Sequence, residues 1–452
     1  LKQPARAFYP RAALTGRALV SVLQTRIVIE GERMLVFIGT YGEKLGHVDG
    51  KGSGVYVLEL DTDSLALVPA GSSGREFVGK PQLGGAEGLL NPSYIVTHKD
   101  AASGTLQLYI VDERYESSGG TVAAASVNAE TAELSLLGAP VLAGGTGTCH
   151  LAVAPGGKHV LAANYFSGSV CCIRRNEDGS LDSGSVLVLQ LPPSTCPISY
   201  PGANVARQEN AHAHMVEFTS NGRVVFVPDL GSDRVWSLGY DADSEEAPLR
   251  MLPVTGPCIS SLLGGGPRHL ALHPSLSIAY VGYELTSLVA AFSFDPATGE
   301  LAAEPLHPGP ICVLDGEANT LSGDAPESAD AQVYRNLVRS GRCSDADTSI
   351  AAVRISPCGG RLLVSSRIVG SPGAISAMPI GADGRLATDS PIRITSSHGL
   401  TPRDFALVPG QDPRLVLVAN QDSDTLFVLP EARPPKNLGA GVPTPVTIAF
   451  EV

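Results

Sequence analysis

The apolar residues of this chain come in short runs that recur in a fixed order. An apolar run is followed by Pro with small or polar residues, a second apolar run, a polar turn and a third apolar run. β-branched residues are frequent in the runs, and turn sequences such as PGG, SNG and PCGG separate them. This pattern is typical of short antiparallel β-strands. No helical period persists after residue 33.

The repeating unit predicts the architecture of the whole chain. Clear copies occupy residues 150–175, 214–240, 269–295, 351–380 and 404–430, and weaker copies occupy residues 34–61 and 94–128. Such a series predicts an all-β fold, a seven-bladed β-propeller with four-stranded antiparallel blades.

The remaining segments fall outside the repeat. Residues 445–452 have no blade of their own, so we expect them to pair with the first blade and close the ring. We expect residues 1–33 to lie outside the fold and residues 34–452 to form a single domain. Residues 191–206 are Pro-rich and residues 315–348 are acidic and Ser-rich, which favours two long loops on a propeller face.

The composition argues against nucleic-acid binding and against a membrane span. Of 452 residues, 43% are hydrophobic and 17% are charged, with 50 Gly and 34 Pro, as in a turn-rich globular protein. The net charge of −13 argues against a nucleic-acid partner. No apolar run is long enough to span a membrane. Oligomeric state is left open.

Cysteine usage and the first residues bear on location. The eight cysteines show no C-x-x-C spacing, which favours buried free thiols in a reducing compartment. We therefore expect the cytoplasm. Residues 1–33 carry six Lys or Arg and two Glu, so import into an organelle is the alternative.

Cationic side chains recur where the first apolar run of a repeat begins. In a propeller these positions converge from different blades on one mouth of the central channel. Here they are His150, His212 with His214, Arg268 with His269, and Arg403 with Asp404. The regularity predicts a polar site on one face that attracts a small anionic substrate.

The two histidines of the sequence HAH have three interpretations. If His212 and His214 lie on a strand, both point to the same side. They could bind a metal, although no third ligand is evident nearby. One of them could be a hydrogen-bonded core residue. We favour a channel wall on which at least one faces the substrate, and we expect no metal and no cofactor.

The other candidates also have structural alternatives. Arg207 and Arg268 have the planar fork that suits carboxylate or phosphate, and the alternative is an ion pair between blades. Glu284 could hold Arg268 in place, act as a base or join two blades. His150 follows the run GGTGTC, which allows a ligand close to the backbone, and the alternative is a turn-capping histidine. We expect Arg403 and Asp404 to pair with each other, and contact with the site is the alternative.

Four longer phrases carry a resemblance to a known family. They are CHLAVAPGGKHVLAANYFSGSV, RQENAHAHMVEFTSNGRVVFVPDLGSDRV, GPRHLALHPSLSIAYVGYEL and TPRDFALVPGQDPRLVLVANQDSDTLFVL. Together they resemble the seven-bladed propeller lactonases, which include bacterial-type 6-phosphogluconolactonases and the fungal 3-carboxy-cis,cis-muconate lactonizing enzyme. The resemblance extends over about residues 34 to 452.

The resemblance implies hydrolysis of a sugar lactone, foremost 6-phosphogluconolactone. Cyclisation of 3-carboxy-cis,cis-muconate is the alternative reaction, and a non-catalytic platform for proteins is an alternative of another class. Few aromatic residues weigh against the platform, at 5% of the chain. We expect the catalytic set to be His150, Arg207, His212, His214, Arg268 and Glu284, with their individual roles left open.

Overall fold

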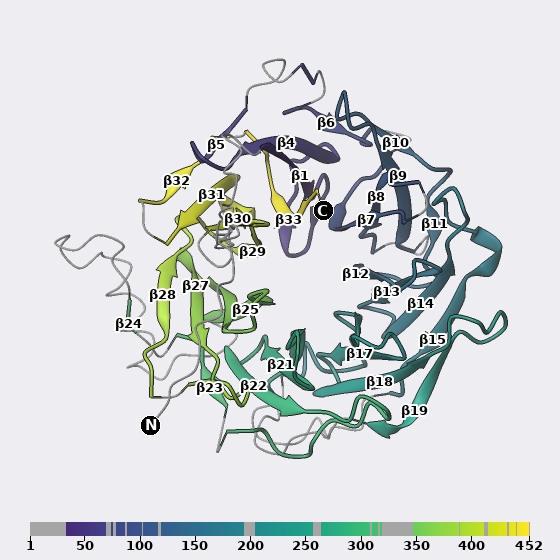
Figure 1. Cartoon of the computed structure of the whole chain (residues 1–452), viewed down its shortest axis with the longest axis vertical. Coiled ribbons are helices and arrows are strands. Elements are labelled where there is room, and N and C mark those ends of the chain that lie inside the picture. Colours follow the sequence, from purple (N-terminus) through teal and green to yellow (C-terminus); the bar gives the residue numbers. More distant parts are fainter. Residues whose placement is uncertain are drawn as a thin grey trace, which may run out of the picture.

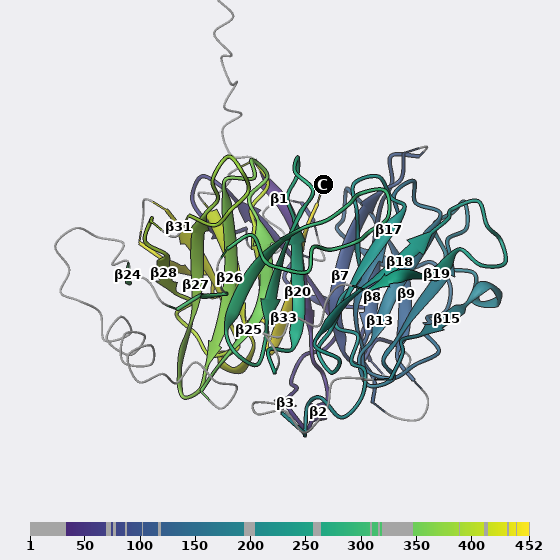
Figure 2. The same ribbon diagram turned by 90° about the horizontal axis from the view of Figure 1, so that it is seen from below.

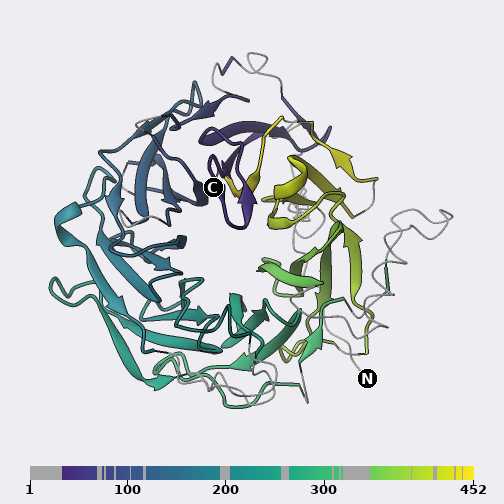
Figure 3. The same ribbon diagram turned by 180° about the vertical axis from the view of Figure 1, so that it is seen from behind.

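Seven β-sheets surround a common centre in the computed structural model of the chain (Figures 1 and 3). The described residues are 33–68, 74–75, 78–85, 88–101, 103–115, 119–193, 204–255, 264–307, 310–314, 317–318, 347–387, 389–410, 415–431, 434–439 and 441–451. The prediction of a seven-bladed propeller with four-stranded antiparallel blades is confirmed.

The first three blades are given from the innermost strand outward. Blade 1 contains β33 (Pro445–Phe450), β1 (Arg33–Thr40), β4 (Val55–Asp61) and β5 (Ala66–Leu67), with β6 (Pro81–Gln82) also on β4. Blade 2 contains β7 (Pro92–Lys99), β8 (Leu106–Asp112), β9 (Thr121–Val127) and β10 (Leu134–Leu136), with β11 (Val141–Leu142) also on β9. Blade 3 contains β12 (Thr148–Val153), β13 (His159–Asn164), β14 (Ser169–Arg174) and β15 (Leu187–Gln190).

The remaining four blades continue around the ring. Blade 4 contains β16 (Glu217–Phe218), β17 (Val224–Asp229), β18 (Arg234–Tyr240) and β19 (Leu249–Thr255). Blade 5 contains β20 (Pro267–Leu272), β21 (Ile278–Tyr283), β22 (Leu288–Ser293) and β23 (Ile311–Cys312). Blade 6 contains β25 (Thr348–Ile355), β26 (Arg361–Ile368), β27 (Ser371–Pro379) and β28 (Arg393–Ser396), with β24 (Glu317–Ala318) parallel to β28. Blade 7 contains β29 (Pro402–Leu407), β30 (Leu415–Asn420), β31 (Thr425–Pro430) and β32 (Lys436–Asn437).

The two ends of the described chain close the ring. The C-terminal strand β33 is the innermost strand of blade 1 and pairs antiparallel with β1, with Ile38 opposite Ile448. The expected closure by the last residues is therefore confirmed. Arg33, which we placed outside the fold, begins β1, and the rest of the predicted extension lies outside the described residues.

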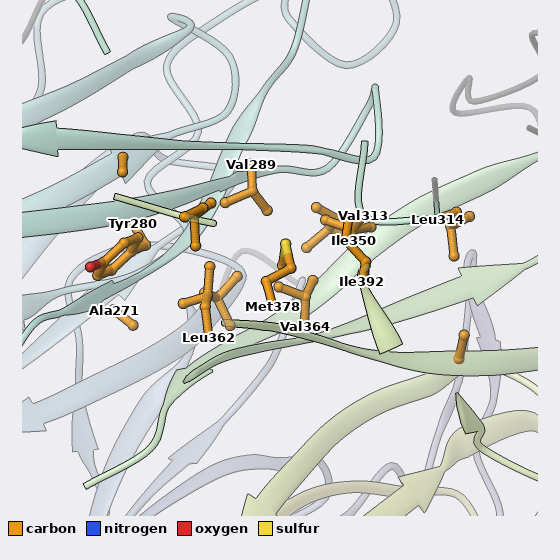
Figure 4. Close-up of a cluster of buried hydrophobic side chains, with 14 of the residues drawn as sticks. Ala271, Tyr280, Val289, Val313, Leu314, Ile350, Leu362, Val364, Met378 and Ile392 are labelled. Atoms are coloured by element: carbon orange, nitrogen blue, oxygen red, sulfur yellow. The ribbon is translucent and has the colours of Figure 1, made fainter. Parts of the chain in front are cut away.

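The core lies between blades rather than in one place. Strands such as β13 and β21 are buried along their whole length, which explains why they are apolar without alternation. Seven apolar clusters fill the seven junctions between neighbouring blades. Figure 4 shows the junction of blades 5 and 6, where Tyr280 and Val289 face Val364 and Met378. These contacts stabilise the ring through burial of apolar surface.

Antiparallel pairing brings two kinds of position to one face of the ring. Where an inner strand begins, its neighbour in the blade ends, as Pro267 opposite Tyr283 in blade 5 illustrates. Segments before β7, β12, β20 and β29 therefore meet segments after β8, β13, β21 and β30. The hairpin of β2 (Lys44–Leu45) and β3 (Val48–Asp49) projects from the ring (Figure 2).

Other elements are short. The described residues include the 3₁₀ turns η1 (Ser183–Ser185) and η3 (Gln421–Ser423), and no helix there is long and apolar enough to cross a membrane. Most of the predicted loops 191–206 and 315–348 lies outside the described residues. Cys171 and Cys172 are buried thiols, as expected, whereas Cys149 and Cys312 are half-buried and Cys358 is exposed.

Candidate active site

A polar cavity of about 320 Å³ opens where the strand ends converge. Its walls come from several blades and from the β2–β3 hairpin, which contributes His47. Five of the six predicted catalytic residues lie on its walls: Arg207, His212, His214, Arg268 and Glu284.

Glu284 is the centre of the cationic wall. It follows β21 and is 3% exposed. Arg268 Nε lies 2.9 Å from Glu284 Oε2, and Arg207 lies 2.8 Å from Oε1. Arg367 near the end of β26 lies 3.1 Å from the same Oε1. One carboxylate thus fixes three guanidinium groups from three parts of the chain.

These ion pairs decide what Glu284 can do. Burial alone would raise the pKa of its carboxyl, but Arg367, Arg207 and Arg268 outweigh burial and hold that pKa well below its usual value. A carboxylate of such low basicity is unsuited to take a proton from water. Of the three interpretations of Glu284, the geometry fits two, since its carboxylate holds Arg268 in place and joins residues of different blades. It does not fit the third, in which Glu284 acts as a base.

The three arginines differ in exposure. The Arg268 side chain is 4% exposed, whereas those of Arg367 and Arg207 are 19% and 34% exposed. Burial lowers the pKa of Arg268 to about 10, which leaves it charged near neutral pH. The cavity therefore has a guanidinium at its base and two nearer to solvent.

A second wall of the cavity is formed by Arg403 and a chain of hydroxyl groups. The guanidinium of Arg403 donates to Tyr41 Oη at 2.9 Å and lies over the Tyr41 ring. The hydroxyls of Tyr41 and Tyr115 both donate to Glu113, at 2.6 and 2.8 Å. Since both oxygens of Glu113 accept a hydrogen bond, this wall holds Arg403 and the two rings in fixed positions.

The expected pair of Arg403 with Asp404 is wrong. Asp404 pairs with Arg354 of blade 6 at 2.8 Å, while Arg403 faces the cavity. The pairing of β29 with β30 is irregular between Pro402 and Asp404, and Arg403 is directed to Tyr41 while Asp404 is directed to Arg354.

Charge is unevenly distributed over the molecule. The described lining residues include four arginines and three glutamates, an excess of one positive charge, although the chain as a whole carries −13. Burial, and next the charge of Arg403, lower the pKa of His47 to about 4. Burial, and next the charge of Arg268, lower the pKa of His214 well below 6.5. Both imidazoles are therefore neutral near pH 7, and the cationic character of the cavity rests on its arginines.

His212 and His214 line the cavity but do not lie on a regular strand. They precede β16, and the segment pairs with β17 through a single bridge from Ala213 to Asp229. Asp229 accepts the backbone N–H of His212 at 2.6 Å, which secures this irregular segment. The expectation that both residues lie on one strand is therefore wrong, although both line the same cavity.

The two rings have different surroundings. His212 stacks on Tyr165, and its Nδ1 and Nε2 lie 3.0 Å from Tyr165 O and 3.1 Å from Glu209 Oε1. His214 has Nδ1 3.8 Å from Cys149 Sγ and Nε2 3.9 Å from Glu284 Oε2. With both nitrogens of His212 engaged, the pair is poorly suited to share a metal. In the described part of the chain, no group of three or more His, Cys, Asp or Glu is placed to hold one.

His150 does not reach the cavity wall. It is 2% exposed, its ring lies 4.1 Å from that of Tyr94, and Val216 N–H faces its Nδ1 at 3.4 Å. The preceding residue, Cys149, lines the cavity instead. His150 packs between inner strands, which differs both from a ligand contact and from the turn cap that we weighed.

A comparison with known protein families identifies the same seven-bladed fold. The family model of the seven-bladed β-propeller lactonases matches residues 35–433. The chain belongs to this family.

Individual relatives differ in how much of their length aligns. A 6-phosphogluconolactonase of Bacillus subtilis is 32% identical over 58% of this chain and 63% of its own length, so this alignment covers less than two thirds of it. A 6-phosphogluconolactonase of Formosa agariphila is 23% identical over 87% of this chain and 91% of its own. The periplasmic gluconolactonase of Pseudomonas aeruginosa shares the fold, with a TM-score of 0.67, 23% identity and coverage of 93% and 99%.

Sequence reasoning missed much of the lactonase cavity. The further lining residues include His47, Glu113, Tyr115, Tyr165, Phe166 and Arg367. Arg403, which the repeat placed at the channel mouth, also lines the cavity but was left out of the expected catalytic set. Glu113 and Tyr165 directly follow the second strands β8 and β13, as Glu284 follows β21. Glu113 and Tyr165 could therefore have been predicted from the sequence, as the residues that directly follow the second strand of a blade.

Proposed function

We propose that this lactonase hydrolyses a phosphorylated sugar lactone, with 6-phosphogluconolactone as the foremost substrate. The observation that carries the proposal is the cluster of Arg207, Arg268, Arg367 and Arg403 around one cavity of an otherwise acidic protein. Guanidinium groups bind phosphate and carboxylate oxygens through paired hydrogen bonds. The names of the two aligned 6-phosphogluconolactonases support the same substrate.

The exposure of the arginines suggests how the substrate is oriented. Arg207 and Arg367 are the more accessible, so they would bind the phosphate near the opening. Arg268 is buried, so it would meet the lactone group at the base, and the half-buried Arg403 lines the same end of the cavity beside it. Glu284 would act as a positioning residue, because it holds three of the guanidiniums before substrate arrives.

Attack on the lactone needs a base for the water proton. His214 is neutral and lines the cavity, so its imidazole can accept the water proton, and Glu284 Oε2 is 3.9 Å from its Nε2. Burial raises the pKa of the Cys149 thiol, which favours the protonated form over the nucleophilic thiolate. Water activated by His214 is therefore favoured over a covalent intermediate on Cys149.

The assignment of His214 predicts a pH profile. Its pKa is held below 6.5 by burial and by Arg268, so the neutral base persists as the pH falls past that value. We expect kcat to stay level on acidification through pH 6.5, and His214→Gln to lower kcat about 100-fold or more. A wild-type kcat that declines with an apparent pKa of 6.5 or higher would contradict this role.

A panel of three substrates tests the proposal. Initial rates are compared for 6-phosphogluconolactone, unphosphorylated glucono-1,5-lactone and 3-carboxy-cis,cis-muconate, each against its uncatalysed rate. We expect the largest acceleration for the phosphorylated lactone. Faster cyclisation of the muconate would favour the alternative reaction, and no acceleration of any substrate would favour a binding platform. The expected cytoplasmic location stays a prediction.

A further inference from the structure

A second, much smaller chamber adjoins the base of the cavity. Its volume is about 20 Å³, which accommodates a single oxygen atom or water and no part of a sugar ring. It shares five lining residues with the main cavity: Glu113, Cys149, His214, Arg268 and Arg403. A group bound in the main cavity is thus next to the chamber.

His269 lines this chamber and has a buried ring N–H group. Arg268 Nη1 lies 3.2 Å from His269 Nε2, and because a guanidinium can only donate, Nε2 must be the acceptor. Burial and Arg268 keep the ring neutral, so its proton is on Nδ1. The residue is 5% exposed, lines the chamber, and its Nδ1 has no hydrogen-bond partner among the described residues.

Ser93 adds a second unsatisfied group to the same wall. It is 5% exposed and lies in the inner strand β7 of blade 2. Its hydroxyl also has no hydrogen-bond partner in the described part of the chain. Buried polar groups without partners are rare and costly, so two of them at one small chamber point to a ligand atom.

The carboxylates at the chamber are already engaged. Glu113 accepts from Tyr41 and Tyr115. Asp404 Oδ1 accepts from Arg354 and its Oδ2 from Ile448 N–H.

Four other groups at the chamber can donate a hydrogen bond: the His269 N–H, the Ser93 hydroxyl and the guanidiniums of Arg268 and Arg403. Tyr94, Cys149 and His214 complete its polar lining. Such a chamber is suited to an acceptor oxygen that gains negative charge.

We propose that this chamber is an oxyanion hole that receives the carbonyl oxygen of the lactone. The proposal rests on the proposed function and adds His269 and Ser93 as catalytic residues. When the water oxygen bonds to the carbonyl carbon, the π-electron pair moves to the carbonyl oxygen, where these donors meet it. The water proton passes to His214. The ring C–O bond then breaks, and that proton goes to the leaving oxygen, which yields the hydroxy acid.

Two substitutions test the hole. His269→Phe keeps a ring but removes the N–H, and His269→Asn, which retains a short N–H donor, is its matched control. Ser93→Ala removes the hydroxyl with little change in volume, so it tests the proposal even where the histidine variants fail to fold. The readouts are kcat and KM for the lactone that the wild type hydrolyses, the Kd of the hydroxy-acid product, and Tm.

We expect His269→Phe to lower kcat about 100- to 1,000-fold, as loss of one oxyanion donor does, with KM and product Kd within about threefold. Ser93→Ala should lower kcat in the same manner but less, and His269→Asn should recover part of the loss. If folded Ser93→Ala and His269→Phe both keep the wild-type kcat, the oxyanion hole is ruled out while the proposed function stands. A lower Tm with kcat unchanged would rule it out as well. A wild type without lactone turnover would remove the proposed function and this proposal together.

Discussion

Glu284→Gln is expected to lower the free energy of unfolding by about 3–5 kcal/mol, the usual effect of breaking a buried ion pair from one side. The substitution leaves Arg207, Arg268 and Arg367 facing one another without their shared counter-charge. Arg268, which is buried, has the least access to water as compensation. Activity should fall as well, because the arginines lose the group that positions them.

Urea unfolding of the wild type and of Glu284→Gln measures the difference in the free energy of unfolding. This difference should also depend on pH. The folded pKa of Glu284 lies below the unfolded value of about 4.3, so its stabilising effect is present above that pH and is lost as the pH falls through the folded pKa. The two unfolding energies should therefore converge in acid.

Glu431→Gln is the matched control. Glu431 also pairs with two arginines, Arg361 and Arg393, but its side chain is 31% exposed. Such a surface pair contributes about 0–1 kcal/mol. Equal destabilisation by the two substitutions would contradict the central place of Glu284.

Arg207→Ala is expected to raise KM for a phosphorylated lactone about 10- to 100-fold. The estimate follows from the loss of a charge-assisted hydrogen bond of about 1.5–3 kcal/mol, where 1.4 kcal/mol corresponds to a factor of ten. KM for unphosphorylated gluconolactone should change by less than about threefold, because that substrate has no phosphate. The melting temperature should change little, since Glu284 keeps Arg268 and Arg367.

Arg207→Lys separates charge from geometry. Lysine keeps the positive charge but lacks the planar fork, so it should recover part of the affinity for the phosphorylated lactone. An equal rise in KM for both lactones after Arg207→Ala would contradict the assignment of Arg207 to the phosphate.

The fold was predictable because a blade repeats the same physical constraint. The inner and middle strands of each blade are covered by neighbouring blades, so runs such as β13 and β30 are apolar on both faces. Ring closure by β33 followed from an apolar strand left without a blade. Exact strand ends, such as Arg33 in β1, depend on pairing rather than on residue type.

The candidate site was only partly predictable. Arg268 and Glu284 stand at strand ends that the repeat identifies, and Arg207 lies in the segment before blade 4. Position within a strand is harder to read, because the pairing of β12 is irregular between Thr148 and His150, where Cys149 faces the cavity and His150 does not. Tyr115 and His47 precede no motif, and they reach the cavity through loops whose course depends on tertiary contacts.

The most direct test is the rate of hydrolysis of freshly prepared 6-phosphogluconolactone by the wild-type protein, with a chelator present, against the spontaneous rate. We expect clear acceleration that excess chelator leaves unchanged and that excess 6-phosphogluconate inhibits. A rate equal to the spontaneous one, at protein concentrations where the fold is intact, would contradict a cavity built for this lactone.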